Sequence, residues 1–225
     1  RNKQVNITNA IFLNSTKIEL VSAFKTLGIF FSETMSWDDH INFIISKLSS
    51  VAGLIYRNKH ILPRRIKLLL YNSLFYSHIN YGHLIWGTTT LTNLQKVFVL
   101  QKKILRSICN VSLEYPTDLL FSELGVMKIF DLYRYRLCLK YKIEQNMHIR
   151  HLEELSNLKR REYSYQTRIM LPWQVPFSRT DYGRQTIAHT LPTILNQLST
   201  NHIELDNLSV GGLREMMISS RNDRD

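Results

Sequence analysis

A stretch of 74 residues, 40–113, contains no aspartate or glutamate. The whole chain has a formal net charge of +11, and this stretch accounts for all but one of those charges. Protein surfaces normally intersperse both signs, because like charges repel each other. A block that lacks acids but keeps the apolar periodicity of packed helices indicates a surface that faces a polyanion. Its ten basic residues are Lys47, Arg57, Lys59, Arg64, Arg65, Lys67, Lys96, Lys102, Lys103 and Arg106.

Composition places the chain among folded proteins. Its 225 residues suffice for one domain or two small ones, and 44% of them are hydrophobic. Two cysteines, Cys109 and Cys138, cannot build a disulfide framework, so we expect a reducing, intracellular compartment. No run reaches the roughly 20 apolar residues of a membrane span, and we expect no membrane contact. The chain starts at Arg1 without a signal-peptide pattern, which leads us to expect part of a longer polypeptide.

The pattern predicts a mainly α fold with a small N-terminal β element over residues 1–35. Apolar, β-branched runs at 11–13, 18–21 and 27–31 are separated by turn formers, which is typical of two or three antiparallel strands. Gly28, inside the third run, marks either a bulge, a close backbone approach or a tolerated glycine.

Residues 36–113 are expected to form a basic helical domain. Ser36 resembles an N-cap followed by Asp38 and Asp39, and apolar residues then recur at helical spacing through residue 55. The two acids point about 100° apart, so capping explains them better than metal binding. Pro63 fits the first turn of a second helix that is buried on several sides.

The most regular amphipathic pattern covers residues 93–110, where basic residues lie opposite a broad apolar arc. No acid supplies the i,i+4 partners that an ordinary solvated face usually has, so nucleic-acid contact is favoured over that alternative. Tyr76, Tyr81 and Trp86 either stack on bases or, as is commoner at helical spacing, belong to the core. The candidate nucleic-acid contacts are Arg64, Arg65, Lys67, Lys96, Lys102, Lys103 and Arg106.

Beyond residue 113 acids and bases alternate as on an ordinary surface. Residues 114–156 are expected to form a helical connection, with helices near 118–124 and 129–145. Residues 157–225 are expected to be a polar, partly irregular tail with one short helix near 186–198 and frayed residues 219–225.

No self-contained active site is apparent. His148 and His151 have helical i,i+3 spacing but no third metal ligand, and the two cysteines lack zinc-site spacing. Phosphate-loop, dinucleotide-binding and nucleophile-elbow motifs are absent. The sequence therefore predicts no catalytic residue, no metal site and no cofactor in this chain.

Residues 24–29, Phe-Lys-Thr-Leu-Gly-Ile, and 35–41, Met-Ser-Trp-Asp-Asp-His-Ile, belong to a series of short strings between residues 18 and 198. The series resembles non-LTR retrotransposon reverse transcriptases of the jockey-like branch, and these two strings resemble the segment just downstream of that family's catalytic palm. The order and spacing of the strings carry the resemblance more than any one of them. The further strings are at 47–48, 71–74, 80–82, 85–87, 100–106, 124–126, 131–133, 179–185 and 191–192.

The resemblance implies specific roles. Phe24, Leu27 and Gly28 would belong to a primer-grip-like strand, and residues 36–113 to the thumb that closes on a template–primer duplex. RNA, DNA and an upstream palm and fingers portion of the same polypeptide would be the partners, in the nucleus or the cytoplasm. The family's two Mg²⁺-binding aspartates fall upstream of Arg1, so we expect this chain alone to incorporate no nucleotides.

Two other readings stay open. One is a stand-alone basic helical protein that binds nucleic acid, or acts as a scaffold, without polymerase ancestry. The other is a helical adaptor whose basic face meets an acidic protein or a membrane. The second explains the charge but not the ordered series of strings.

Overall fold

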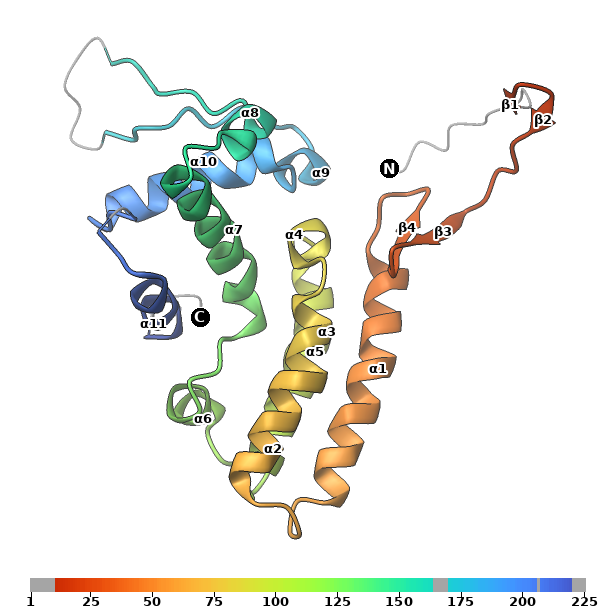
Figure 1. Cartoon of the computed structure of the whole chain (residues 1–225), viewed down its shortest axis with the longest axis vertical. Coiled ribbons are helices and arrows are strands. Elements are labelled where there is room, and N and C mark those ends of the chain that lie inside the picture. Colours follow the sequence, from red (N-terminus) through yellow and green to blue (C-terminus); the bar gives the residue numbers. More distant parts are fainter. Residues whose placement is uncertain (1–10, 164–169, 206, 220–225) are drawn as a thin grey trace.

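The computed structural model describes residues 11–163, 170–205 and 207–219. The predicted fold class is confirmed: two small β-hairpins at the N-terminus precede a chain that is mainly helical (Figure 1). Residues 5–10 and 220–225, for which strand and frayed chain were expected, lie outside the described residues. None of the described helices combines the length and the apolar character that crossing a membrane requires.

The β element consists of two separate antiparallel hairpins rather than one sheet. Strand β1 (Phe12–Leu13) pairs with β2 (Thr16–Lys17), and β3 (Ala23–Thr26) pairs with β4 (Ile29–Ser32). The strand predicted at residues 18–21 is absent, because those residues form the extended link between the hairpins. Residues 27 and 28 are a tight turn instead of part of a strand.

Helix α1 (Asp38–Arg57) begins one residue later than the sequence predicted. Its N-cap is Trp37, although the Ser36 hydroxyl still accepts a hydrogen bond from the Asp38 amide at 3.2 Å. Asp38 and Asp39 lie in the first turn, where the helix dipole favours acids. The buried face includes Ile41, Leu48 and Ile55.

The next helix is continuous but not uniformly α. Helix α2 (Arg64–Leu70) passes through a π-helical turn, η1 (Tyr71–Tyr76), into α3 (Ser77–Asn80) without leaving helical dihedral angles. Gly82, with φ of 59°, then redirects the chain into α4 (His83–Trp86). A Cβ on Gly82 would lie 2.6 Å from the end of the Ile29 side chain, so glycine also lets the second hairpin approach the helices.

Helix α5 (Leu91–Cys109) packs against both α1 and α2 and closes the first helical group. The Thr90 hydroxyl caps its start by accepting a hydrogen bond from the Asn93 amide, and Asn110 ends it in the left-handed conformation. Val97, Ile104 and Leu105 on its inner face are fully buried.

The rest of the chain forms a second helical group against α4 and α5 (Figure 1). The predicted tail is more ordered than expected: the described residues beyond 156 include three helices, and Leu191, Leu195 and Leu213 are buried in the core. The elements of this group are α6 (Thr117–Glu123), α7 (Ile129–Asn146), α8 (His151–Ser156), α9 (Asp181–Arg184), α10 (Ile187–Thr200) and α11 (Val210–Ser219).

The buried side chain of Gln101 forms hydrogen bonds to both groups. The Gln101 amide of α5 donates to the Tyr71 hydroxyl at 2.9 Å and to the Met127 carbonyl at 2.8 Å. Its carbonyl oxygen accepts from the Ile129 amide at the start of α7. Gln101 is fully buried, and both the nitrogen and the oxygen of its side-chain amide are hydrogen-bonded. It therefore fixes the position of the start of α7 against α5.

Candidate nucleic-acid interface

The outer face of α5 carries four cationic side chains along one side of the helix. Lys96 and Lys103 are exposed, whereas Lys102 and Arg106 are half-buried at the other margin of the same face. The inner residues of α5 pack in the core, so this face is the side that α5 turns to solvent. The structure therefore brings together four of the seven predicted contacts.

Three of these cations make different contacts with neighbouring residues. The Lys96 ammonium donates to the Asn93 side chain at 3.2 Å, and that of Lys102 lies 4.8 Å from the centre of the Phe98 ring. Arg106 donates to the Tyr115 carbonyl through two nitrogens, at 3.3 and 3.1 Å. These contacts orient the side chains without neutralising them, because none of the acceptors is a carboxylate.

The ion pairs seen between described residues involve none of the four. Asp38 lies near Lys96: hydrogen bonds from Ser36 and Asn93 and, more weakly, the charge of Lys96 lower its pKa. The α5 face consequently presents positive charge that the fold does not use internally, which is what phosphate binding needs.

Lys67 does not belong to this face, and the expectation that it contacts nucleic acid is corrected. Its side chain is only 1% exposed. The ammonium donates to the carbonyls of Lys59 and Ser107, at 2.9 and 3.1 Å, and to the Asn110 side chain at 3.0 Å. Three acceptors satisfy all three of its N–H donors, so Lys67 ties α2 to the C-terminal end of α5.

The two arginines of α2, Arg64 and Arg65, do not extend the α5 face, although the sequence predicted them as contacts together with it. Arg64 forms an ion pair of 2.6 Å with Glu123 of α6, an acid from outside the acid-free block. Arg65 is exposed, and helical geometry places it roughly opposite Lys67, the residue that points to α5. Arg64 is therefore partly neutralised, and Arg65 is directed away from α5.

The second hairpin exposes the residues that were predicted to be primer-grip-like. Phe24 stacks on Phe31 at 5.5 Å between ring centres yet remains half exposed. Leu27 and Gly28 form the turn, with φ of 46° and 79°. Leu27 is 84% exposed in a conformation that branched apolar residues rarely adopt.

That hairpin is attached to the helices by polar contacts from two strings of the resemblance. The Tyr81 hydroxyl donates to the Leu27 carbonyl at 2.7 Å, and the Phe30 amide donates to His40 at 3.5 Å. The His40 ring packs edge-on against Trp86, at 5.6 Å. Tyr81 is exposed and Trp86 is fully buried, so the two aromatics divide between surface and core.

Two buried histidines lie at this junction. Burial, helped by the charge of Lys25, lowers the pKa of His40 to about 4. Burial also lowers the pKa of His83 to about 3, and a contact with the Ile79 backbone opposes this shift. Both rings are therefore neutral near pH 7 and act as packing groups.

Two further cations, which sequence reasoning did not select, border the hairpin. The Lys25 ammonium lies 4.3 Å from the Phe43 ring centre and 5.1 Å from that of Phe30, and the Lys47 ammonium lies 5.7 Å from Phe43. The proximity of Lys25 to α1 depends on how the hairpin folds back, so no local signal could have found this pair.

Nucleophilic and metal chemistry find no support among the described residues. No group of three or more possible metal ligands occurs there, and His148 and His151 are exposed. Burial raises the pKa of the Cys138 thiol to about 12 and also raises that of Cys109, so neither is an activated nucleophile.

Comparison with known proteins gives one relation. The chain is 29% identical over 113 residues to the Retrovirus-related Pol polyprotein from type-1 retrotransposable element R1 of Bradysia coprophila. The alignment covers 48% of this chain and 11% of the polyprotein, so the chain spans a small part of that relative. No family model matches the chain, and no solved structure matches it. The chain thus resembles a retrotransposon Pol polyprotein.

Proposed function

We propose that this chain is the C-terminal, thumb-like part of a retrotransposon RNA-directed DNA polymerase, and that it holds a template–primer duplex against α5. The single observation that carries the proposal is the α5 face, where Lys96, Lys102, Lys103 and Arg106 lie together without an ion pair to any carboxylate of the described residues. The similarity to the R1 polyprotein supports a polymerase origin over a stand-alone scaffold.

A helix face of this kind contacts phosphates rather than base edges. Lysine and arginine side chains in a row neutralise backbone charge and release counterions whatever the sequence of the duplex. The A-like geometry of an RNA–DNA hybrid is recognised mainly through its backbone and shape. The face therefore suits a protein that must move along many sequences.

The hairpins fit the same proposal. Exposed apolar side chains, among them Phe12, Leu13, Phe24 and Leu27, cover the N-terminal 11–35 region. In the proposal they contact the preceding palm portion of the polypeptide and the end of the primer. That portion would supply the Mg²⁺-binding aspartates, and the whole protein would act on RNA and DNA in the nucleus or the cytoplasm.

The proposal is tested by binding the purified chain to two RNA–DNA hybrids of equal length and unrelated sequence, by fluorescence anisotropy over a series of salt concentrations. We expect similar affinities for both hybrids and a steep, linear loss of log K with log salt, about −0.9 per phosphate contact on B-form DNA and similar here. Absence of binding at low salt, or a strong preference for one sequence, would overturn it.

A further inference from the structure

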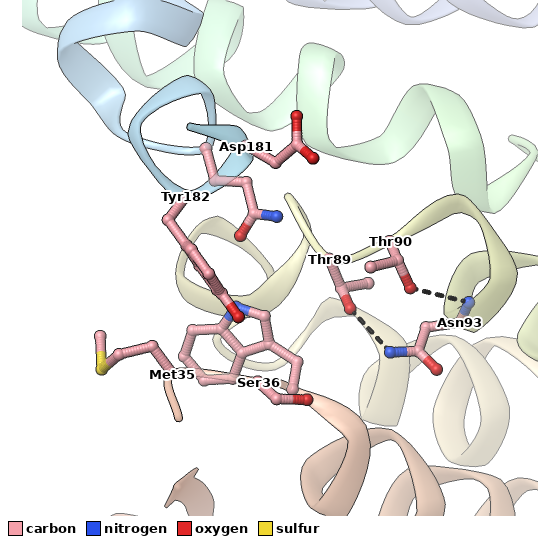
Figure 2. Close-up of a pocket in the computed structure, with 9 residues that line it drawn as sticks. Met35, Ser36, Thr89, Thr90, Asn93, Asp181 and Tyr182 are labelled. Carbon is pink, nitrogen blue, oxygen red and sulfur yellow. Dashed lines mark hydrogen bonds between the residues drawn. The ribbon is translucent and has the colours of Figure 1, made fainter. Parts of the chain in front are cut away.

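A pocket of about 200 Å³ opens where three segments that are distant in the sequence meet (Figure 2). Residues 35–37 precede α1, Thr89, Thr90 and Asn93 surround the start of α5, and residues 181–185 come from α9 and its end. Pockets that enclose drug-sized ligands measure about 300–1,000 Å³. This one suits a single flat ring system rather than an extended cofactor.

Two aromatic side chains contribute to its walls. Trp37 packs edge-on against Phe31 at 5.7 Å and against His40 at 6.4 Å, both measured between ring centres. Tyr182 reaches in from α9 and is 49% exposed (Figure 2). Trp37 is half-buried and Tyr182 is exposed, so both side chains keep surface that a ligand can contact.

The polar part of the pocket is rigid and leads to the basic face. Asn93 is 2% exposed and donates to Asp38 at 2.7 Å and to the Thr89 hydroxyl at 3.0 Å. Its oxygen accepts from Lys96, the first cation of the α5 face. The pocket wall therefore adjoins the first cation of the α5 face, and it also includes Asp181, which forms an ion pair of 3.5 Å with Arg184.

Groups at the mouth remain available for hydrogen bonds. The Gln185 amide and the Tyr182 hydroxyl line the pocket, and neither makes a side-chain hydrogen bond to another described residue. An amide offers both donors and an acceptor, so it can pair with the edge of a heterocycle that carries both.

We propose that this pocket binds an unpaired nucleobase of a single strand that extends from the duplex on α5. A nucleobase combines a flat face for Trp37 and Tyr182, an edge for Gln185, and a flanking phosphate for Lys96. This inference rests on the proposed function, and it assigns a binding site to the unpaired strand, which the α5 face alone does not contact.

Tyr182 is the position to test, since Trp37 also supports the hairpin through Phe31 and His40. Tyr182→Ala removes the ring, Tyr182→Leu keeps apolar bulk without a flat face, and Tyr182→Phe keeps the ring. Tyr56→Ala is the matched control, because Tyr56 is similarly exposed at 59% and does not line the pocket.

The probes are a fluorescent oligothymidylate and an abasic oligonucleotide of the same length and charge, compared by anisotropy at moderate salt. The full chain should prefer the strand with bases by roughly 5- to 150-fold, the range expected for stacking of one base. Tyr182→Ala and Tyr182→Leu should lose that preference, whereas Tyr182→Phe and Tyr56→Ala should keep it. Circular dichroism confirms that each variant is folded.

Equal affinity of the wild-type chain for the two strands would overturn the proposal, and so would an unchanged preference in a folded Tyr182→Leu. A blunt RNA–DNA hybrid, measured in parallel, separates this from the duplex proposal, because it offers phosphates without an unpaired base. Failure to bind the blunt hybrid would refute the duplex proposal, and the base preference would still decide the pocket.

Discussion

Helices α2 and α5 come from the same acid-free block, yet the fold treats their basic residues in opposite ways. On α2, Lys67 is buried against three oxygen atoms and Arg64 is paired with Glu123. On α5, Lys102 and Lys103 have no carboxylate partner among the ion pairs of the described residues. The comparison shows that the number of basic residues in a sequence sets only an upper limit on the charge that can bind a ligand. Packing decides which of those residues stay accessible.

The largest predicted effect is the difference in stability between a substitution at Lys67 and the same substitution at Lys103. Replacing Lys67 with Met leaves two carbonyls and an amide oxygen without their donor, so we expect the free energy of unfolding to fall by about 2–4 kcal/mol. Lys103→Met should change it by less than about 0.5 kcal/mol. Urea unfolding measures both, and similar losses in the two variants would erase the contrast.

A second effect comes from the two buried histidines, because their burial makes the stability of the fold depend on pH. In the folded state the pKa of His40 is about 4 and that of His83 about 3, below the ordinary value of 6.5. Between these folded-state pKa values and 6.5, the unfolded chain binds more protons than the folded chain. The free energy of unfolding is therefore unaffected by these histidines above pH 6.5 and falls as the pH drops from 6.5 toward 4.

At pH 5 the deeply buried His83 should cost about 2 kcal/mol of unfolding free energy relative to pH 7.5, and His40 should cost less because solvent screens it more. Urea unfolding at the two pH values measures the loss. His83→Leu should flatten the dependence, while the exposed His60 replaced by Leu serves as the control. An identical pH dependence in the wild type and His83→Leu would show that His83 is not the titrating group.

The smallest effect should come from releasing Arg64. Glu123→Gln removes its carboxylate partner, and we expect affinity for an RNA–DNA hybrid at low salt to rise by up to about fivefold, since an exposed pair contributes about 0–1 kcal/mol. Asp118→Asn, which releases Lys128 outside the block, is the control of equal charge change. A rise of the same size in both variants would indicate a general charge effect.

Much of this architecture could be predicted because it depends on local pattern. The apolar arc of α5 and the acids that open α1 are encoded within single helices, and both helices are found within two residues of their expected starts. The fold class follows from the same periodicity. The tail was underestimated because α9 and α11 are short, and Gly211 and Gly212 weaken the helical pattern of α11.

Other features could not be predicted because they depend on where elements meet. Lys67 has the sequence context of an exposed basic residue, and only the approach of the α5 C-terminus makes it a buried donor. The turn at Leu27 and Gly28 was read as strand, because leucine rarely takes the positive φ that this turn requires. The pocket joins segments about 145 residues apart and has no local signature.

The central claim is that the exposed cations of α5 contact the phosphates of a duplex. Its most direct test is the slope of log K against log salt on an RNA–DNA hybrid, for the wild type and for Lys102→Glu/Lys103→Glu. The matched control is Lys159→Glu/Arg161→Glu, which makes the same change in net charge at exposed residues that lie outside α5 and do not line the pocket. We predict that the α5 variant binds more weakly and loses up to about two units of slope, whereas the control keeps the wild-type slope. Equal affinities and equal slopes for the wild type and the α5 variant would contradict the account.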